Sequence, residues 1–300
     1  MAHYIASTAD TMSHGTGDIH IWQKVVPEDA LHHEFLLDGL LALSSLHFAG
    51  QNPTSRLLYT EIAMHYQASA LKRYKDALND IATENRCALF AFSVLLNILA
   101  LAFPNICSTP TESSHEESVM LLIELLQGMR FILQAPNVFH EELTKYEPLF
   151  AKYMRATGPP KPSDDAASAI LKLRERADSP QHSTDVERHQ AYLSGIESLE
   201  ATFGHVNEDP GYLGHIIAWP TTVGERLFAL LKQEDPMAQL IFIHYGVLLL
   251  QTRHRWWGRN TGYRLIQGLA RSISEKHPDW AGATHWAMTT AAIAVQEDPS

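Results

Sequence analysis

The run LFAFSVLLNILALAF at residues 89–103 is apolar on every face of a helix, and it constrains the fold more than any other stretch of the chain. A membrane span needs roughly 20 apolar residues, so this shorter run predicts a helix buried in a protein core. A second run, LIFIHYGVLLL at 240–250, is apolar on all sides in the same way. Such helices need others to cover them, and 300 residues with 45% hydrophobic content are enough to form a large core.

Helical periodicity recurs along most of the chain. Leu36, Leu40 and Leu43 lie on one helix face, and a later segment has apolar residues on one stripe and charges on the other. No segment shows the alternating, turn-bounded pattern of a strand, so the predicted fold class is all-α. The predicted helices cover 34–49, 56–81, 89–103 with a stop at Pro104, 119–133, 185–206, 237–257, 262–274 and 280–296, with one more between Pro220 and Pro236.

The clearest break is ATGPPKPSDDAAS at 156–168, where three prolines lack backbone donors. We interpret it as a mobile connection within one multi-helix domain over residues 1–300. That domain is predicted to hold an apolar pocket among its C-terminal helices.

Charge and motifs exclude several classes of function. A formal net charge of -11 gives no basic field to gather phosphates, so direct nucleic-acid binding by the chain is disfavoured. The chain has only two cysteines, Cys87 and Cys107, and lacks zinc-site spacing, nucleotide loops and common hydrolase motifs, so we expect no metal and no cofactor. Neither a secretory signal nor a membrane span is predicted. We expect a cytoplasmic or nuclear protein that is not secreted and that is a possible homo-oligomer.

The segment RHRWWGRN at 253–260 places arginines beside a tryptophan pair. A nucleic-acid stacking platform conflicts with the acidity of the chain. In a second interpretation, Trp256 and Trp257 close a helix end against the core while the arginines face water. In a third, the tryptophans pack on a flat apolar ligand at a pocket mouth, and Arg253 or Arg255 binds its oxygen.

Other candidates are polar or aromatic groups on apolar helices. His244 and Tyr245 lie within the run at 240–250, and each is either a core residue with a hydrogen bond or a ligand contact. Asn97 and Arg130 are isolated polar groups on predicted buried helices, with the same two interpretations. Phe242 and Leu249 complete the set as apolar candidates for the ligand.

Four segments together resemble a known domain. IWQKVVPEDALHHEFLLDGLLALSSLHFAG, SVLLNILALAF, ELLQGMRFIL and the stretch from IIAWPTTVGERLFALL to RHRWW resemble, in that order, the C-terminal regulatory domain of fungal zinc-cluster transcription factors of the sterol-uptake-control type. The resemblance implies an all-helical fold with a deep apolar ligand pocket in a nuclear regulator. The chain departs from the family in having no six-cysteine zinc cluster, and in continuing the tryptophan pair with GRNTGYRLI.

Two functions follow as hypotheses. In the first, the domain binds a hydrophobic small molecule, which is a sterol, terpenoid or polyketide. In the second, it is a cofactor-independent enzyme of secondary metabolism, a cyclase or Diels-Alderase-type pericyclase, in which the cavity aligns reacting groups. Tyr245, His244, Arg253 and Arg255 are then candidates to polarise a carbonyl oxygen. The candidate ligand contacts are Trp256, Trp257, Phe242, Leu249, Asn97 and Arg130.

Overall fold

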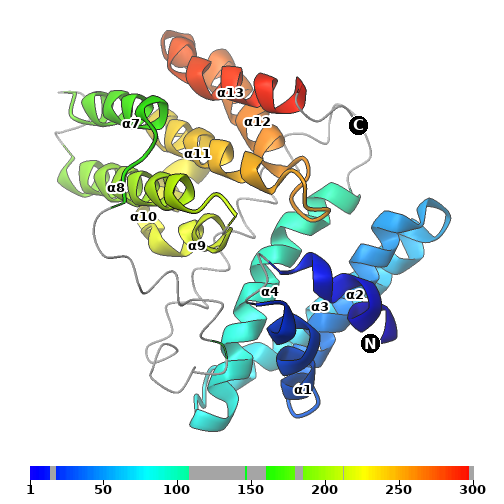
Figure 1. The fold of residues 1–300 in the computed structure, drawn as a ribbon. Helices are drawn as coiled ribbons and strands as arrows, with labels where there is room; N and C mark the ends of the chain where they lie inside the picture. Colours follow the sequence, from blue (N-terminus) through cyan, green and yellow to red (C-terminus); the bar gives the residue numbers. More distant parts are fainter. Residues whose placement is uncertain (14–17, 108–145, 147–159, 180–184, 212, 297–300) are drawn as a thin grey trace. The chain divides into compact units, whose positions relative to one another are not determined.

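The structure is a computed structural model that describes residues 1–13, 18–107, 146, 160–179, 185–211 and 213–296. Every regular element among these residues is helical, which confirms the predicted all-α class. The described residues form two compact units (Figure 1). The first unit contains the residues up to Cys107, Tyr146 and the segment Arg255–Trp257. The second contains the residues from Pro160 to His254 and from Gly258 to Gln296.

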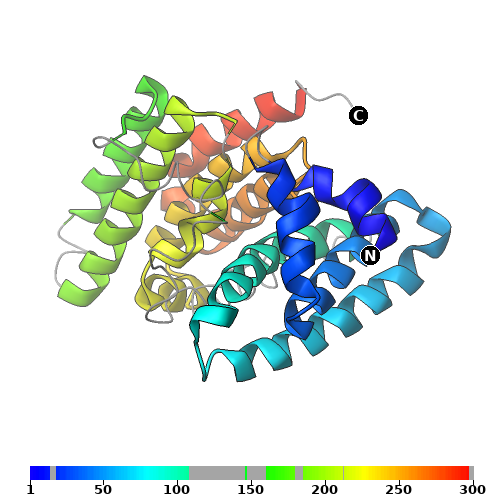
Figure 2. The ribbon, with the colours of Figure 1, turned by 60° about the horizontal axis from the view of Figure 1, so that its bottom comes forward.

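Three long helices form most of the first unit. In Figure 2, α2 and α3 lie side by side as a helical hairpin, in agreement with their extensive contact. The elements of this unit are η1 (Tyr4–Thr8), η2 (Ala9–Thr11), η3 (Ile21–Val25), α1 (Val26–Ala30), α2 (Glu34–Gln51), η4 (Pro53–Ser55), α3 (Arg56–Ala77) and α4 (Thr83–Cys107).

An aromatic cluster holds these three helices together. The rings of Phe35, Tyr74 and Phe92 come from α2, α3 and α4, with centroids 4.7 to 5.6 Å apart. A Cβ added at Gly39 would lie 2.7 Å from the Phe92 ring, so the glycine allows α4 to approach α2 closely. Glu84–Ile106 is long and apolar enough to cross a membrane, but 94% of its most apolar window is buried. It is therefore placed as a core helix, as the sequence predicts.

One predicted boundary of α4 is wrong. Pro104 does not stop the helix, which continues to Cys107. A proline removes the hydrogen bond to the carbonyl four residues earlier, and here the loss falls in the last turn, where few later bonds depend on it. The Asn105 side chain supports this turn by donating to the Leu101 carbonyl at 2.9 Å.

The second unit is built around a central apolar helix, α11, which contacts α8, α10, α12 and α13. Figure 1 shows α7 beside α8, and α12 and α13 beyond α11. The elements are α7 (Asp164–Ala177), α8 (Val186–Glu208), α9 (Gly214–Thr222), α10 (Glu225–Lys232), α11 (Pro236–Leu249), η6 (Leu250–Thr252), α12 (Thr261–Lys276), η7 (Pro278–Thr284) and α13 (His285–Gln296). Helix α7 begins within the stretch that the sequence assigns to a Pro-rich connection.

Helix α11 is buried on every face, from Met237 to Leu249. Its closest neighbour is α12, because Gly246 and Gly262 let the two backbones meet. A Cβ added at Gly262 would lie 2.6 Å from the Gly246 carbonyl oxygen and 2.6 Å from the Leu250 backbone nitrogen. Backbone atoms cannot yield as a side chain can, so only glycine fits there.

The predicted helix over 237–257 is wrong at its C-terminal end. Helix α11 stops at Leu249, one 3-10 turn follows, and the tryptophan pair lies in turns. Thr252 stabilises the ending, because its hydroxyl donates to the Leu249 carbonyl at 2.7 Å and lies 3.3 Å from the Gly258 carbonyl. Hydroxyl bonds of this kind compete with helix continuation.

Candidate functional site

The segment Arg255–Trp257 packs within the first unit, against the N-terminal turns. Trp256 Nε1 donates to the Thr11 hydroxyl at 2.8 Å, and Arg255 Nη1 donates to the Thr11 carbonyl at 3.3 Å. Trp257 is fully buried, and its carbonyl accepts a bond of 2.8 Å from Asn105 on α4. These residues therefore hold the segment in place through side-chain and backbone hydrogen bonds.

Trp256 also covers a buried histidine. Its ring stacks on His47 of α2 with centroids 4.8 Å apart and an interplanar angle of 28°. The His47 ring also lies 3.0 Å from the Thr8 hydroxyl and 3.1 Å from the Gln51 amide. Burial, with a smaller contribution from nearby His3, lowers the pKa of His47 to about 4. The imidazole is thus neutral at physiological pH.

One side of α11 in the second unit is an aromatic core. Tyr245 stacks on Trp219 with centroids 4.4 Å apart and an angle of 21°, and its hydroxyl donates to the Ile216 carbonyl at 3.2 Å. Phe242 meets Trp219 and Phe228 edge-to-face, each at 5.2 Å. Tyr245 and Phe242 thus have packing partners from α9 and α10.

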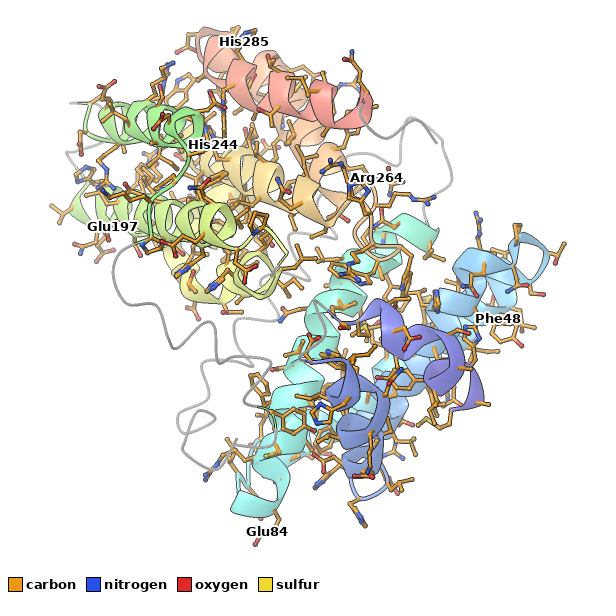
Figure 3. All side chains as sticks on the ribbon, viewed as in Figure 1. Phe48, Glu84, Glu197, His244, Arg264 and His285 are labelled. Carbon is orange, nitrogen blue, oxygen red and sulfur yellow. The ribbon has the colours of Figure 1, made fainter. Side chains whose placement is uncertain are left out.

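The opposite side of α11 lines a cavity of about 830 Å³. Leu240 and His244, one helical turn apart, form the contribution of α11 to this lining. Figure 3 labels His244 on α11. The other walls come from α7, η7 and the first turn of α13. The lining residues are Asp165, Ser168, Ala169, Lys172, Leu173, Glu175, Arg176, Ser179, Leu240, His244, Asp279, Trp280, Gly282, Ala283, His285 and Trp286.

The lining divides into a buried base and an exposed rim. Most buried members are apolar, namely Ala169, Leu173, Leu240 and Trp280, with His244 as the polar exception. The charged members Asp165, Lys172, Glu175 and Asp279 are exposed, and Arg176 is half-buried. A cavity of several hundred Å³ with an apolar base and few buried polar groups is typical of small-molecule sites.

Both tryptophans of the cavity are fixed by charged residues of α7. Trp286 Nε1 donates to Asp165 at 2.7 Å, and the Arg176 guanidinium lies 4.6 Å from the Trp280 ring centroid. Such contacts hold a large ring in one orientation. The aromatic walls are therefore ordered before any ligand binds.

His244 is the sequence-predicted candidate that the structure places in this cavity. The residue is 3% exposed, and the Trp286 ring stacks on its imidazole with centroids 5.1 Å apart and an interplanar angle of 25°. The pKa of His244 is lowered to about 4, because the effect of burial exceeds the opposing effect of its hydrogen bond to the Leu240 carbonyl. A neutral imidazole at the base of the cavity provides a hydrogen-bonding group without a charge.

The other candidates lie elsewhere. Asn97 is buried on α4 in the first unit, and its amide oxygen has no hydrogen-bond partner in the described part of the chain. Leu249 is fully buried at the end of α11, and Arg253 donates to the Leu250 carbonyl at 3.3 Å. Arg130 lies outside the described residues. Within those residues, no group of three or more histidine, cysteine or acidic side chains is arranged to hold a metal ion.

Sequence reasoning missed Trp280 and Trp286. Both occur in WAGATHWAMTT, a stretch with helical periodicity and no recognisable motif. Their partners Arg176 and Asp165 precede them by more than a hundred residues, so no local pattern shows the site. The available signal was the presence of two tryptophans near the predicted C-terminal pocket.

We expect acid to destabilise the protein below about pH 6.5. Burial is the main cause that lowers the pKa of His47, His215 and His244 from the ordinary value of 6.5 to about 4. Between pH 6.5 and pH 4 the unfolded chain therefore binds more protons than the folded protein. The free energy of unfolding has its full value above the pKa of these histidines in the unfolded chain. It decreases as the pH falls below that pKa, by up to about 1.4 kcal/mol per pH unit for each histidine. Urea unfolding at pH 7, 6 and 5 measures it.

The matched variants for this experiment are His244→Phe and His32→Asn. The first removes a buried imidazole and should reduce the pH dependence of the unfolding free energy. The second changes an exposed histidine and should leave it unchanged. Equal unfolding free energies at pH 7 and pH 5 in the wild type would contradict the lowered pKa values of the buried histidines.

Comparison with known proteins finds similarity in the N-terminal part of the chain. Residues 1–137 match the family model for the fungal specific transcription factor domain. Sterol uptake control protein 2 of Candida albicans is 30% identical over 115 residues, which are 38% of this chain and 16% of that protein. These matches confirm the resemblance to a fungal transcription factor domain. The family match ends before the first residue that lines the cavity.

Proposed function

We propose that the second unit binds a neutral hydrophobic small molecule in the cavity between α7, α11, η7 and α13. The observation that carries the proposal is a cavity of about 830 Å³ with an apolar base, two fixed tryptophans and a buried neutral histidine. Sites of this size bind molecules up to the size of a typical drug and bury most of their surface. Sterols, terpenoids and polyketides fall within this class.

The charges at the rim favour a neutral ligand. Lys172 and Arg176 are offset by Asp165, Glu175 and Asp279, so neither sign dominates the entrance. A site for a phosphate or a coenzyme would concentrate positive charge. The name of the Candida albicans relative makes sterols the first ligands to test, and a fungal regulatory role would place the protein in the nucleus or the cytoplasm.

The first experiment is native mass spectrometry of the full chain after incubation with fungal extract. It is followed by titration with cholesterol, farnesol and 1-naphthol as probes for the three ligand classes. A molecule retained unchanged supports a binding domain. A molecule converted to a new product would replace this conclusion with the cyclase or pericyclase alternative. If no extract component is retained and no probe binds, the proposal is wrong.

We expect Trp280→Ala to weaken binding of the best probe at least tenfold. The substitution removes an aromatic wall of the cavity, and tenfold corresponds to about 1.4 kcal/mol of binding free energy. Isothermal titration calorimetry measures the effect, and circular dichroism checks that the helices persist.

Trp256→Ala is the matched control, because Trp256 belongs to the first unit and does not line the cavity. Its affinity for the probe should equal that of the wild type. A loss of binding confined to Trp256→Ala would instead support the pocket-mouth interpretation of RHRWWGRN.

A further inference from the structure

The tautomer of His244 follows from its hydrogen bond. His244 Nδ1 lies 2.8 Å from the Leu240 carbonyl oxygen, one turn earlier on α11. A carbonyl oxygen only accepts hydrogen bonds, so Nδ1 must carry the proton and donate it. Because burial keeps the ring neutral, with its pKa lowered to about 4, the other nitrogen, Nε2, bears a lone pair.

The lone pair on Nε2 has no partner among the described residues, since the only hydrogen bond of His244 there is the one through Nδ1. That bond turns Nδ1 back toward α11, which leaves the distal edge of the ring on the side of the cavity that His244 lines. His244 as a whole is 3% exposed, and Nε2 is not among the fully buried atoms that lack a hydrogen-bond partner, so a molecule in the cavity can reach it. A ligand that donates a hydrogen bond to Nε2 would gain about 0.5–1.5 kcal/mol, the usual net contribution of one neutral hydrogen bond.

The ring is held in this orientation from a second side. Trp286 stacks on its face, and Trp286 is itself held by its bond to Asp165. A flip of the imidazole would break the bond to Leu240. The acceptor is therefore fixed before a ligand arrives, which lowers the entropic cost of using it.

We propose that the ligand of this cavity carries a hydroxyl group that donates its hydrogen to Nε2 of His244. This inference rests on the proposed function and adds the chemical class of the ligand, a neutral alcohol or phenol. A methyl ether of the same molecule has no hydrogen to donate and would place its oxygen lone pairs against that of Nε2. A site built to pair with a hydroxyl discriminates against the analogue that lacks it.

The test compares each probe alcohol with its own methyl ether, namely cholesterol, farnesol and 1-naphthol with their O-methyl derivatives. On the wild-type chain we expect the ether of the best probe to bind about tenfold more weakly, as for the loss of one neutral hydrogen bond. In His244→Phe, which keeps a ring to stack on Trp286 but has no acceptor, alcohol and ether should bind equally. His244→Gln restores an acceptor and should recover part of the preference.

The outcomes distinguish this inference from the proposed function on which it rests, the binding of a small molecule in the cavity. If alcohol and ether bind the wild type equally, the hydroxyl assignment is overturned while binding in the cavity stands. If the preference persists in His244→Phe with intact circular dichroism, another group recognises the hydroxyl and the role of His244 is overturned. If neither alcohols nor ethers bind the wild type, both proposals fail. The wild-type comparison needs no variant, so a folding defect cannot obscure it.

Discussion

We expect Asp235→Ala to lower the free energy of unfolding by about 2–4 kcal/mol, because it removes a buried carboxylate that caps α11 and accepts a charged hydrogen bond from the half-buried Arg188. Asp235 is 6% exposed and forms an ion pair with Arg188 of α8. Its other oxygen accepts from the Tyr192 hydroxyl at 2.8 Å and from the Ala238 backbone at 2.9 Å. The substitution therefore removes the N-cap of α11 and the carboxylate that accepts from the Arg188 guanidinium and the Tyr192 hydroxyl.

Asp185→Ala is the control for this prediction. Asp185 is also an N-cap, for α8, and accepts from the Arg188 backbone at 3.0 Å, but it is exposed. Loss of an exposed cap costs about 1 kcal/mol. Chemical denaturation followed by circular dichroism compares the two variants. Similar losses for both would show that the network of Asp235, Arg188 and Tyr192 adds nothing beyond capping.

The second large effect is expected for Trp257→Ala, at about 3–5 kcal/mol. Trp257 is fully buried in the first unit, and the truncation leaves a cavity where the indole was. The Asn105 bond to its backbone carbonyl remains available, so the loss reports on the side chain. Thermal unfolding of the wild type and the variant at one protein concentration measures it.

Trp256→Ala provides the comparison, since Trp256 is only half-buried and forms one side-chain hydrogen bond and one stacking contact. Its expected loss is about 1–2 kcal/mol. If Trp257→Ala unfolds at the wild-type temperature, the segment Arg255–Trp257 does not pack in solution as described.

The sequence predicted those helices whose stability comes from their own apolar stripe. Leu36, Leu40 and Leu43 mark α2 correctly, and the periodic segments at 185–206 and 262–274 correspond to α8 and α12. In these elements the local pattern and the tertiary packing favour the same structure. The predicted boundaries differ from the observed ones by a few residues.

The end of α11 was not predictable in this way. Nothing in LLLQTRHRWW interrupts a helical pattern before Gly258, so the sequence favours one long helix. The segment bends away because Trp256 and Arg255 find hydrogen-bond partners on Thr11, more than 240 residues earlier. Packing between distant segments overrides local propensity here.

The candidate site was predictable from the sequence only in part. An otherwise apolar helix with one histidine marks His244 as a group that needs a partner, and the structure places it at a cavity. The sequence could not distinguish the cavity side of α11 from its aromatic core side. A helix that is apolar all round has no polar face to indicate its orientation.

The chain order of the first unit also has a consequence for biosynthesis. The bond between Asn105 and the Trp257 carbonyl joins residues 152 positions apart. At the usual rate of translation, the ribosome needs on the order of 10 s to make the intervening chain. During that interval the apolar surface that later receives Trp257 stays open on the nascent protein. A chaperone that binds exposed apolar surface would find its target at this stage, and release should follow synthesis of residues 255–257.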